Sequence, residues 1–282
     1  MASVRHSPAI HAKVGRKLGS AAGSRFAKLI IVAAACVGST VSPAQMPEGL
    51  VRSVAETGSR LVAERDNYTY TQVFKFHEIK NGVRVGRYEE IRDITFTGTG
   101  ERVEQHRRRP VQRLMRIRLT PEDFRDLRDV NPFVLTTDTV RFYRVRYRGT
   151  EMIDAEECHI LELRPRQILY GQRFFDGLVW VGVEHGQVVR AAGRPVPQVH
   201  RLKESNLFPA FETRYGPVEG GHWFPVRTEG DDILPFPSGH QRVRVLIEYS
   251  NYKRFTASST VTFDEPASAA GTREDPRPDA TR

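Results

Sequence analysis

One cysteine stands directly before one histidine, Cys158 and His159, in the apolar run ECHILELRP. A thiol beside an imidazole could act as a nucleophile with its base, or the pair could help to hold a metal ion. The run has the pattern of a β-strand, however, and adjacent side chains of a strand point to opposite faces. The two groups would then lie out of hydrogen-bond reach, so the pattern favours a buried and unreactive cysteine.

The rest of the chain supplies no strong catalytic or metal-binding motif. The seven histidines after residue 44 show none of the close His–His or Cys–His spacings that zinc sites use. Gly230-Asp231-Asp232 could offer oxygens to calcium, although such a pair is more often a solvated turn. GxSxG, phosphate-loop and GxGxxG motifs are absent. We therefore predict no cofactor and no enzyme; an exported hydrolase using His159, His222 or Asp231 is an alternative that no spacing favours.

The first 44 residues have the plan of a secretory signal. They hold six basic and no acidic residues, which account for six of the nine net positive charges. Their apolar centre, 29–37, is shorter than the roughly 20 residues of a bilayer span, and small residues precede Ala44. We expect cleavage after Ala44, which gives a periplasmic protein. The alternative is a membrane-anchored lipoprotein, because Cys36 follows three alanines as in a lipobox and could carry a lipid anchor. The near balance of charge after residue 44 removes the case for a nucleic-acid partner, and no later stretch predicts a membrane span.

Beyond the leader most segments are predicted to be strands. Residues 47–65 predict an amphipathic helix, and a short second helix begins at Thr120 with a proline and acids in its first turn. The predicted fold is mainly β (α+β): a large antiparallel sheet, curled into an open or closed barrel, with few helices. One domain is expected over 47–260, followed by a disordered tail over 264–282. Turns are predicted at Asn81-Gly82, Asp176-Gly177, His185-Gly186, Gly220-Gly221, Gly230-Asp231-Asp232 and 235–239.

Several strands are apolar on both faces, and few helices are available to cover the second face. Either the sheet surrounds a fully packed core or it leaves an apolar cavity for a ligand, and the pattern leaves both open. Two strands carry aromatic and aliphatic residues on one face at a spacing of two. The residues predicted to line such a cavity are Tyr70, Phe74, Phe76, Tyr143, Val145 and Tyr147.

The densest positive patch falls between residues 106 and 118. It could bind anionic lipid head groups or an acidic partner protein. The alternative is a solvated strand face whose arginines pair with acids on neighbouring strands. The predicted members of an anionic-partner patch are Arg107, Arg108, Arg109, Arg116 and Arg118.

Residues 143–192 resemble a known family. The order YRVRYRG, EECHILELRPR, FFDGLVWVG and QVVRAAG is similar to the strand core of periplasmic lipoprotein-localisation factors, the LolA-like superfamily. Residues 219–225, EGGHWFP, resemble that family's G-x-W-x-P strand. The chain departs from the family at Gly182-Val183-Glu184, where an Asp is usual, and no lipid-contacting residue of the family matches a position here. The resemblance implies a strongly curved antiparallel half-barrel with helices over its concave face.

The resemblance also implies a function. A non-enzymatic envelope protein would hold acyl chains of a lipid or lipoprotein in the concavity, since each buried methylene contributes about 0.8 kcal/mol. The superfamily also contains envelope-stress sensors. The alternative is therefore a protein-interaction module that uses the same curved sheet and its edges to hold a polypeptide partner.

Overall fold

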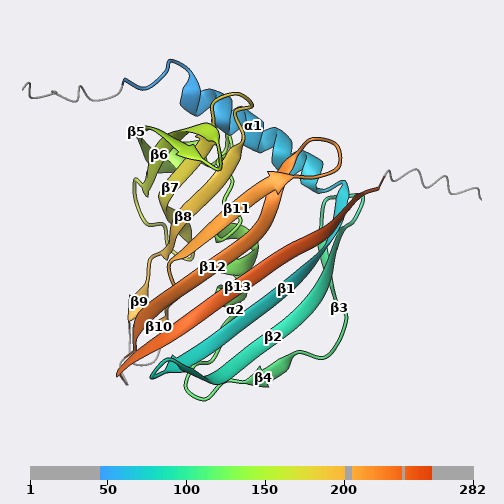
Figure 1. Ribbon diagram of the computed structural model, residues 1–282, viewed down its shortest axis with the longest axis vertical. Coiled ribbons are helices and arrows are strands. Elements are labelled where there is room, and N and C mark those ends of the chain that lie inside the picture. The colour runs from blue at the N-terminus through green and yellow to red at the C-terminus, as the bar shows by residue number, and fades with distance from the viewer. Residues whose placement is uncertain (1–44, 201–204, 237–238, 256–282) are drawn as a thin grey trace, which may run out of the picture. The chain divides into compact units, whose positions relative to one another are not determined.

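The structure, a computed structural model (Figure 1), describes residues 45–200, 205–236 and 239–255. These residues all fall within one unit of the chain, Ser42–Arg282. The predicted leader, with Cys36, and the predicted tail over 264–282 lie outside the described residues.

Eleven strands form one antiparallel sheet that does not close, in the order β3-β2-β1-β13-β12-β11-β8-β7-β6-β5, with β4 also beside β2. Two short strands, β9 and β10, pair only with each other. The bounds are β1 Tyr68–Lys80, β2 Val83–Phe96, β3 Arg102–His106, β4 Val111–Arg113, β5 Tyr143–Ile153, β6 Glu156–Pro165, β7 Phe174–Gly182, β8 Val188–Val196, β9 Val199–His200, β10 Ser205–Asn206, β11 Phe211–Pro217, β12 Trp223–Phe236 and β13 Gly239–Arg254.

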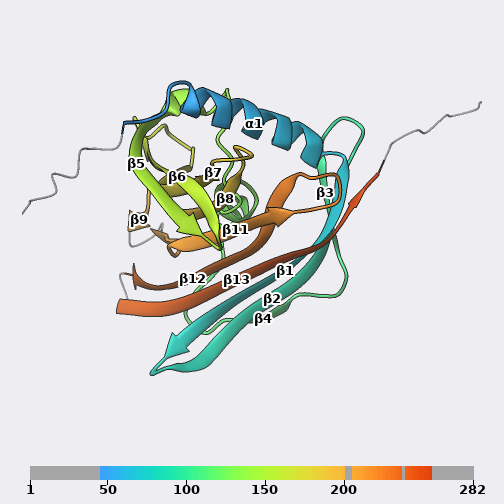
Figure 2. The ribbon, with the colours of Figure 1, turned by 45° about the horizontal axis from the view of Figure 1, so that its top comes forward.

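The sheet is strongly curved, and the helix α1 (Leu50–Arg65) lies across its concave side (Figures 1 and 2). Alternation along the strands decides which side chains face that side: on β1, Phe74 and Phe76 are buried, whereas Lys75 and His77 between them are partly exposed. The predicted fold class, a mainly β half-barrel with helices over the concave face, is confirmed, and the barrel is open.

Helix α1 buries a narrow stripe of Val54, Ala55, Gly58 and Leu61. A Cβ at Gly58 would lie 2.0 Å from the carbonyl oxygen of Leu135, so glycine lets the helix approach the backbone of the segment 131–139. The helix therefore packs on a second covering segment as well as on the sheet.

The second helix begins at Thr120 as predicted, with a capping box between Thr120 and Asp123. It runs as α2 (Pro121–Arg125) and continues as a π-helix, η1 (Asp126–Val130). Asp126 is fully buried, and its Oδ2 accepts a hydrogen bond from Arg173 at 2.6 Å. Burial raises the pKa of Asp126 to about 7, although Arg173 acts in the opposite direction. The pair attaches η1 to the residue before β7. A single turn of 3-10 helix, η2 (Val140–Phe142), then leads into β5.

Two predicted turns are wrong. Asp176-Gly177 lies inside β7, and Gly230-Asp231-Asp232 lies inside β12. Gly177 pairs with Gly193 of β8, and a Cβ at either glycine would come within 2.7 to 2.8 Å of the ring of Phe175. These glycines make room for an aromatic ring on the concave face, which is a tertiary requirement that a local turn pattern does not reveal.

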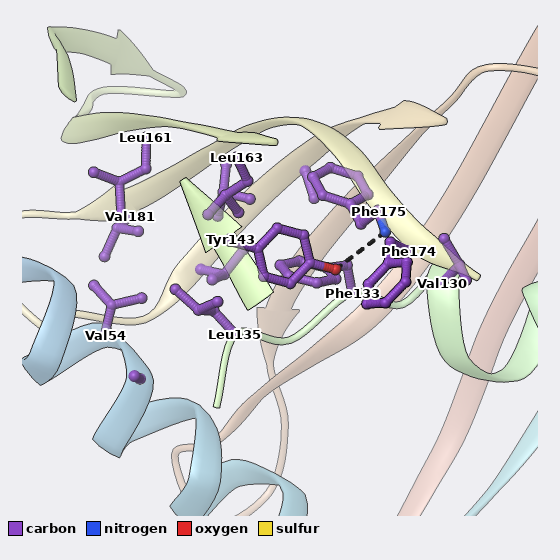
Figure 3. Close-up of a cluster of buried hydrophobic side chains, with 14 of the residues drawn as sticks. Val54, Val130, Phe133, Leu135, Tyr143, Leu161, Leu163, Phe174, Phe175 and Val181 are labelled. Carbon is purple, nitrogen blue, oxygen red and sulfur yellow. Dashed lines mark hydrogen bonds between the residues drawn. The ribbon is translucent and has the colours of Figure 1, made fainter. Parts of the chain in front are cut away.

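The apolar interior forms two large clusters. The first joins β5 to β8 and β11 with residues of the cover, and Figure 3 shows Val54 of α1 and Leu135 of the covering segment in it. Within it Phe133 stacks on Phe175 with ring centroids 4.5 Å apart. The second cluster lies over β1, β2, β12 and β13 and includes Leu127 of η1. The cover therefore contributes side chains to both clusters.

Candidate ligand-binding site

The six predicted lining residues all lie on strands β1 and β5, and they do not come together. Three of them, on β1, belong to the second apolar cluster; the other three, on β5, belong to or pack on the first. Six strands of the sheet separate β1 from β5. Phe74 and Phe76 are no more than 2% exposed, so the protein's own side chains fill the concave face around them.

On β5 the predicted lining residues are partly engaged by polar contacts. The hydroxyl of Tyr143 accepts a hydrogen bond from the backbone N–H of Phe175 at 3.2 Å (Figure 3). The hydroxyl of Tyr147 lies 3.1 Å from Nδ1 of His159, and Val145 packs at the margin of the first cluster. Tyr143 is buried, whereas Val145 and Tyr147 are partly exposed.

A small hollow lies between α1, the segment from Arg128 to Val134 and the sheet. Its volume is about 30 Å³, which is room for one or two water molecules and not for an acyl chain. Apolar side chains dominate its wall on the helix and the covering segment, and tyrosines dominate its floor. The lining residues are Leu61, Val62, Arg65, Tyr70, Arg102, Arg128, Pro132, Val134, Phe224, Pro225, Tyr249 and Tyr252.

Three tyrosines make the floor of this hollow. Tyr70 and Tyr252 stack with centroids 5.0 Å apart, and Tyr70 lies 6.3 Å from Tyr249. Burial raises the pKa of Tyr249 and Tyr252 well above the ordinary value, so both hydroxyls stay protonated. Arg102 donates a hydrogen bond to the hydroxyl of Tyr70 at 2.9 Å. The floor is therefore a cluster of stacked and tilted aromatic rings with a polar rim at one side.

A row of hydrogen-bonding side chains crosses the concave face beside the hollow. Thr213 of β11 lies 2.7 Å from the hydroxyl of Thr228 on β12, which lies 3.4 Å from that of Tyr249 on β13. Gln72 of β1 pairs in register with Tyr249 and accepts a hydrogen bond from Arg92 of β2 at 3.0 Å. The row satisfies polar groups inside the curved sheet, as burial requires.

The row ends in a buried ionic group. Arg92 is 3% exposed, lies 3.0 Å from Glu90 and also contacts Glu104. The hydroxyl of Tyr88 donates to Glu90 at 2.9 Å. Sequence reasoning did not identify this group. The available signal was that Glu90 and Arg92 share the inward, even-numbered face of their strand with Tyr88.

Cys158 and His159 point to opposite faces, as the strand pattern predicts. Cys158 packs with Trp180 and Val189 on the convex side, whereas His159 contacts Tyr147 on the concave side. Burial raises the pKa of the Cys158 thiol to about 11, so the thiolate is scarce at neutral pH. This cysteine is a packing residue. Among the residues that the structure describes, no three His, Cys, Asp or Glu side chains converge as metal ligands would.

The predicted arginine patch lies along the outer edge of β2, around β3 and β4. Arg107 is paired with Asp93 at 2.7 Å and also donates to Thr71, so its charge is neutralised locally. Arg116 reaches Oε1 of Gln241 at 3.4 Å. Arg108, Arg109 and Arg118 are exposed. Of the helices within the described ranges, none is long and apolar enough to cross a bilayer.

No protein-family model and no curated protein matches the chain. Among similar solved structures, a DUF1329 family protein from Desulfovibrio piger has 14% identity and a TM-score of 0.40 over 74% of this chain and 95% of the other. A LolA superfamily protein from Nitrosomonas europaea has 17% identity and a TM-score of 0.35 over 73% and 94%. An outer membrane lipoprotein-sorting protein domain from Vibrio parahaemolyticus has 11% identity and a TM-score of 0.35 over 74% and 95%.

Proposed function

We propose that the chain is a non-enzymatic periplasmic protein that binds an acyl chain of a lipid or lipoprotein between α1 and the concave face of the sheet. The observation that carries the proposal is the hollow under α1, where the aromatic floor of Tyr70, Tyr249 and Tyr252 meets an apolar wall. Such a surface offers dispersion contacts to a flexible hydrocarbon chain without any covalent chemistry.

Binding requires the cover to move, because about 30 Å³ cannot contain an acyl chain. Lifting α1 exposes Val54 and Leu61, which costs roughly 3–6 kcal/mol for these two side chains. Burial of roughly a dozen methylenes contributes on the order of 10 kcal/mol. The contacts of the acyl chain therefore offset the cost of exposing these two side chains.

Polar contacts of α1 with its surroundings are few and lie at its surface. The hydroxyl of Ser59 lies 2.9 Å from that of Thr137, and Glu64 lies 3.2 Å from Arg254 and 3.7 Å from His222. Exposed ion pairs contribute little to stability. These contacts support a helix that can leave the sheet without unfolding it.

A disulfide that locks the cover tests the proposal. In the chain without its leader, Ser59→Cys and Thr137→Cys would place two thiols where the two hydroxyls now meet, and the native Cys158 is buried. We expect the reduced double variant to bind a fluorescent fatty acid. The oxidised form should bind it with an affinity at least roughly tenfold lower.

The single variant Thr137→Cys is the matched control and should bind equally under both conditions. Absence of binding in every form, together with native mass spectra that never show co-purified lipid, would contradict the proposal. Equal binding by the oxidised and reduced double variant would show that the acyl chain enters without separation of α1 from the segment 131–139.

The outer edge of β5 favours one alternative function. Among the described strands, β5 has a partner on one side only, β6, so its other edge can pair with an extended segment of another polypeptide. Crosslinking in the cell envelope distinguishes the two functions. A single dominant protein partner captured along β5, with no lipid co-purifying, would support the protein-interaction module.

A further inference from the structure

The turn between β1 and β2 lies at the same end of the sheet as β4 (Figure 1), and aliphatic side chains are exposed there. The exposed fraction is 66% for Val83, 41% for Val85 and 74% for Met115. Gly86 lies against the carboxylate of Glu78, and that carboxylate binds the N–H of Met115 at 2.7 Å. Val85 and Met115 are therefore held at the same end of the molecule.

Basic residues surround these aliphatic side chains. Residues 107–118 contain six arginines and no acidic residue. Arg107 is neutralised by Asp93, but over the described part of the chain no carboxylate forms an ion pair with Arg108, Arg109, Arg113 or Arg118.

The neighbouring strand adds to the positive charge. Arg84 and Arg87 of β2 share one carboxylate, that of Glu89, at 3.7 and 3.6 Å. Arg87 pairs in register with Arg113 of β4, which continues the row of guanidinium groups across two strands. Glu78 is fully buried and its carboxylate accepts three backbone N–H groups, so it is not available as an ion-pair partner at the surface.

We propose that this end of the sheet docks on the surface of a bilayer that contains anionic phospholipids. Guanidinium groups bind phosphate oxygens of the head groups in a bidentate manner, and Val83, Val85 and Met115 enter the boundary between head groups and acyl chains. Each arginine near an anionic surface contributes about 1 kcal/mol, and salt screens that attraction.

A membrane fits this end better than an acidic protein does. Protein interfaces concentrate their binding energy in anchors that fill pockets on the partner, often tryptophan, tyrosine or arginine. Exposed aliphatic residues at a hairpin end, interspersed with arginines, suit a fluid surface that adapts to them. The surface is remote from the contacts that carry the acyl-chain proposal, so each proposal can fail without the other.

Vesicle flotation tests the proposal. The protein without its leader is mixed with two kinds of vesicle. We expect binding to phosphatidylcholine vesicles that contain one-third phosphatidylglycerol and little binding to phosphatidylcholine alone. The double variant Arg113→Gln/Arg118→Gln should lower the partition coefficient roughly thirtyfold, which corresponds to about 2 kcal/mol. The matched control Arg144→Gln/Arg146→Gln removes two exposed arginines from β5 and should retain most of the binding.

A second pair of variants tests the aliphatic contribution. Met115→Ser should weaken vesicle binding severalfold. The side chain of Met152 on β5 is 61% exposed, and Met152→Ser should leave the binding unchanged. Absence of binding to the anionic vesicles, or equal losses from both arginine pairs, would overturn the proposal. Binding to the anionic vesicles that Met115→Ser leaves unchanged would overturn the proposed insertion of this side chain into the bilayer.

Discussion

At the scale of single residues, Glu78 shows how a buried charge can hold an irregular segment in place. Its carboxylate accepts backbone N–H groups from Met115, Arg116 and Ile117 at 2.7, 2.8 and 2.6 Å. Gly86 leaves the space that the carboxylate occupies, since a Cβ there would lie 2.0 Å from Oε2 of Glu78. The segment after β4 therefore depends on one side chain for its backbone hydrogen bonds.

Replacing Glu78 tests this dependence. Glu78→Gln should lower the free energy of unfolding by about 2 kcal/mol, because an amide puts a donor where the segment needs an acceptor and removes the charge. Urea unfolding followed by circular dichroism measures the change. Glu229→Gln, an exposed pair partner of Arg227, is the control and should change the unfolding free energy little. Equal effects of both variants would contradict the assigned role.

The alternation of a strand can place such residues on a face but cannot name their partners. Alternation places Gln72, Glu78 and Arg92 on inward faces. Arg92 meets Gln72 from the adjacent strand, whereas Glu78 meets a segment nearly forty residues further along the chain. A period-two pattern contains no information about these distant contacts, so the polar row and the buried ionic group could not be predicted.

At the scale of elements, Gly58 has a different role from the one its position in a helix indicates. In sequence it weakens α1; in the structure it allows the helix to touch the backbone of Leu135. Gly177 and Gly193 have a similar role beside Phe175. Helix ends were predictable from caps, as at Thr120, because capping is local, whereas the use of these glycines depends on elements far away in sequence.

Gly58→Ala separates the two roles. Helix propensity alone predicts stabilisation by about 1 kcal/mol, whereas a methyl group against the Leu135 carbonyl predicts a net loss of roughly 1–2 kcal/mol. We expect the loss, measured by thermal or urea unfolding. Ser53→Ala on the exposed side of the same helix is the control and should be neutral or slightly stabilising. A more stable Gly58→Ala protein would show that α1 packs less closely than described.

At the scale of the whole molecule, the sheet and its cover differ in how firmly they are held. The central strands β1, β13 and β12 pair over most of their length, while α1 is held by one narrow apolar stripe and surface contacts. The resemblance to the LolA-like superfamily predicted this architecture. It did not predict that side chains of the protein itself fill the concave face, because packing density depends on all side chains together.

Hydrogen exchange in the native protein should reveal this difference. Amides of α1 should exchange through an opening that leaves β1 and β13 protected, because few apolar contacts must break for α1 to leave. Exchange mass spectrometry resolved by peptides measures both regions in one sample. Protection of α1 equal to that of β13 would mean that cover and sheet open together, and it would argue against a movable helix.

The pairing of β1 with β13 has a consequence for how the polypeptide matures. Tyr68 lies opposite Arg254, so the middle of the sheet brings together the first and the last strands described. A ribosome must synthesise all the strands between them, and β13 itself, before β1 can meet this neighbour, and such long-range closure is slow. β1 therefore stays without one of its two neighbours until β13 has been synthesised, and the edge that β13 later covers is open to other strands during that interval.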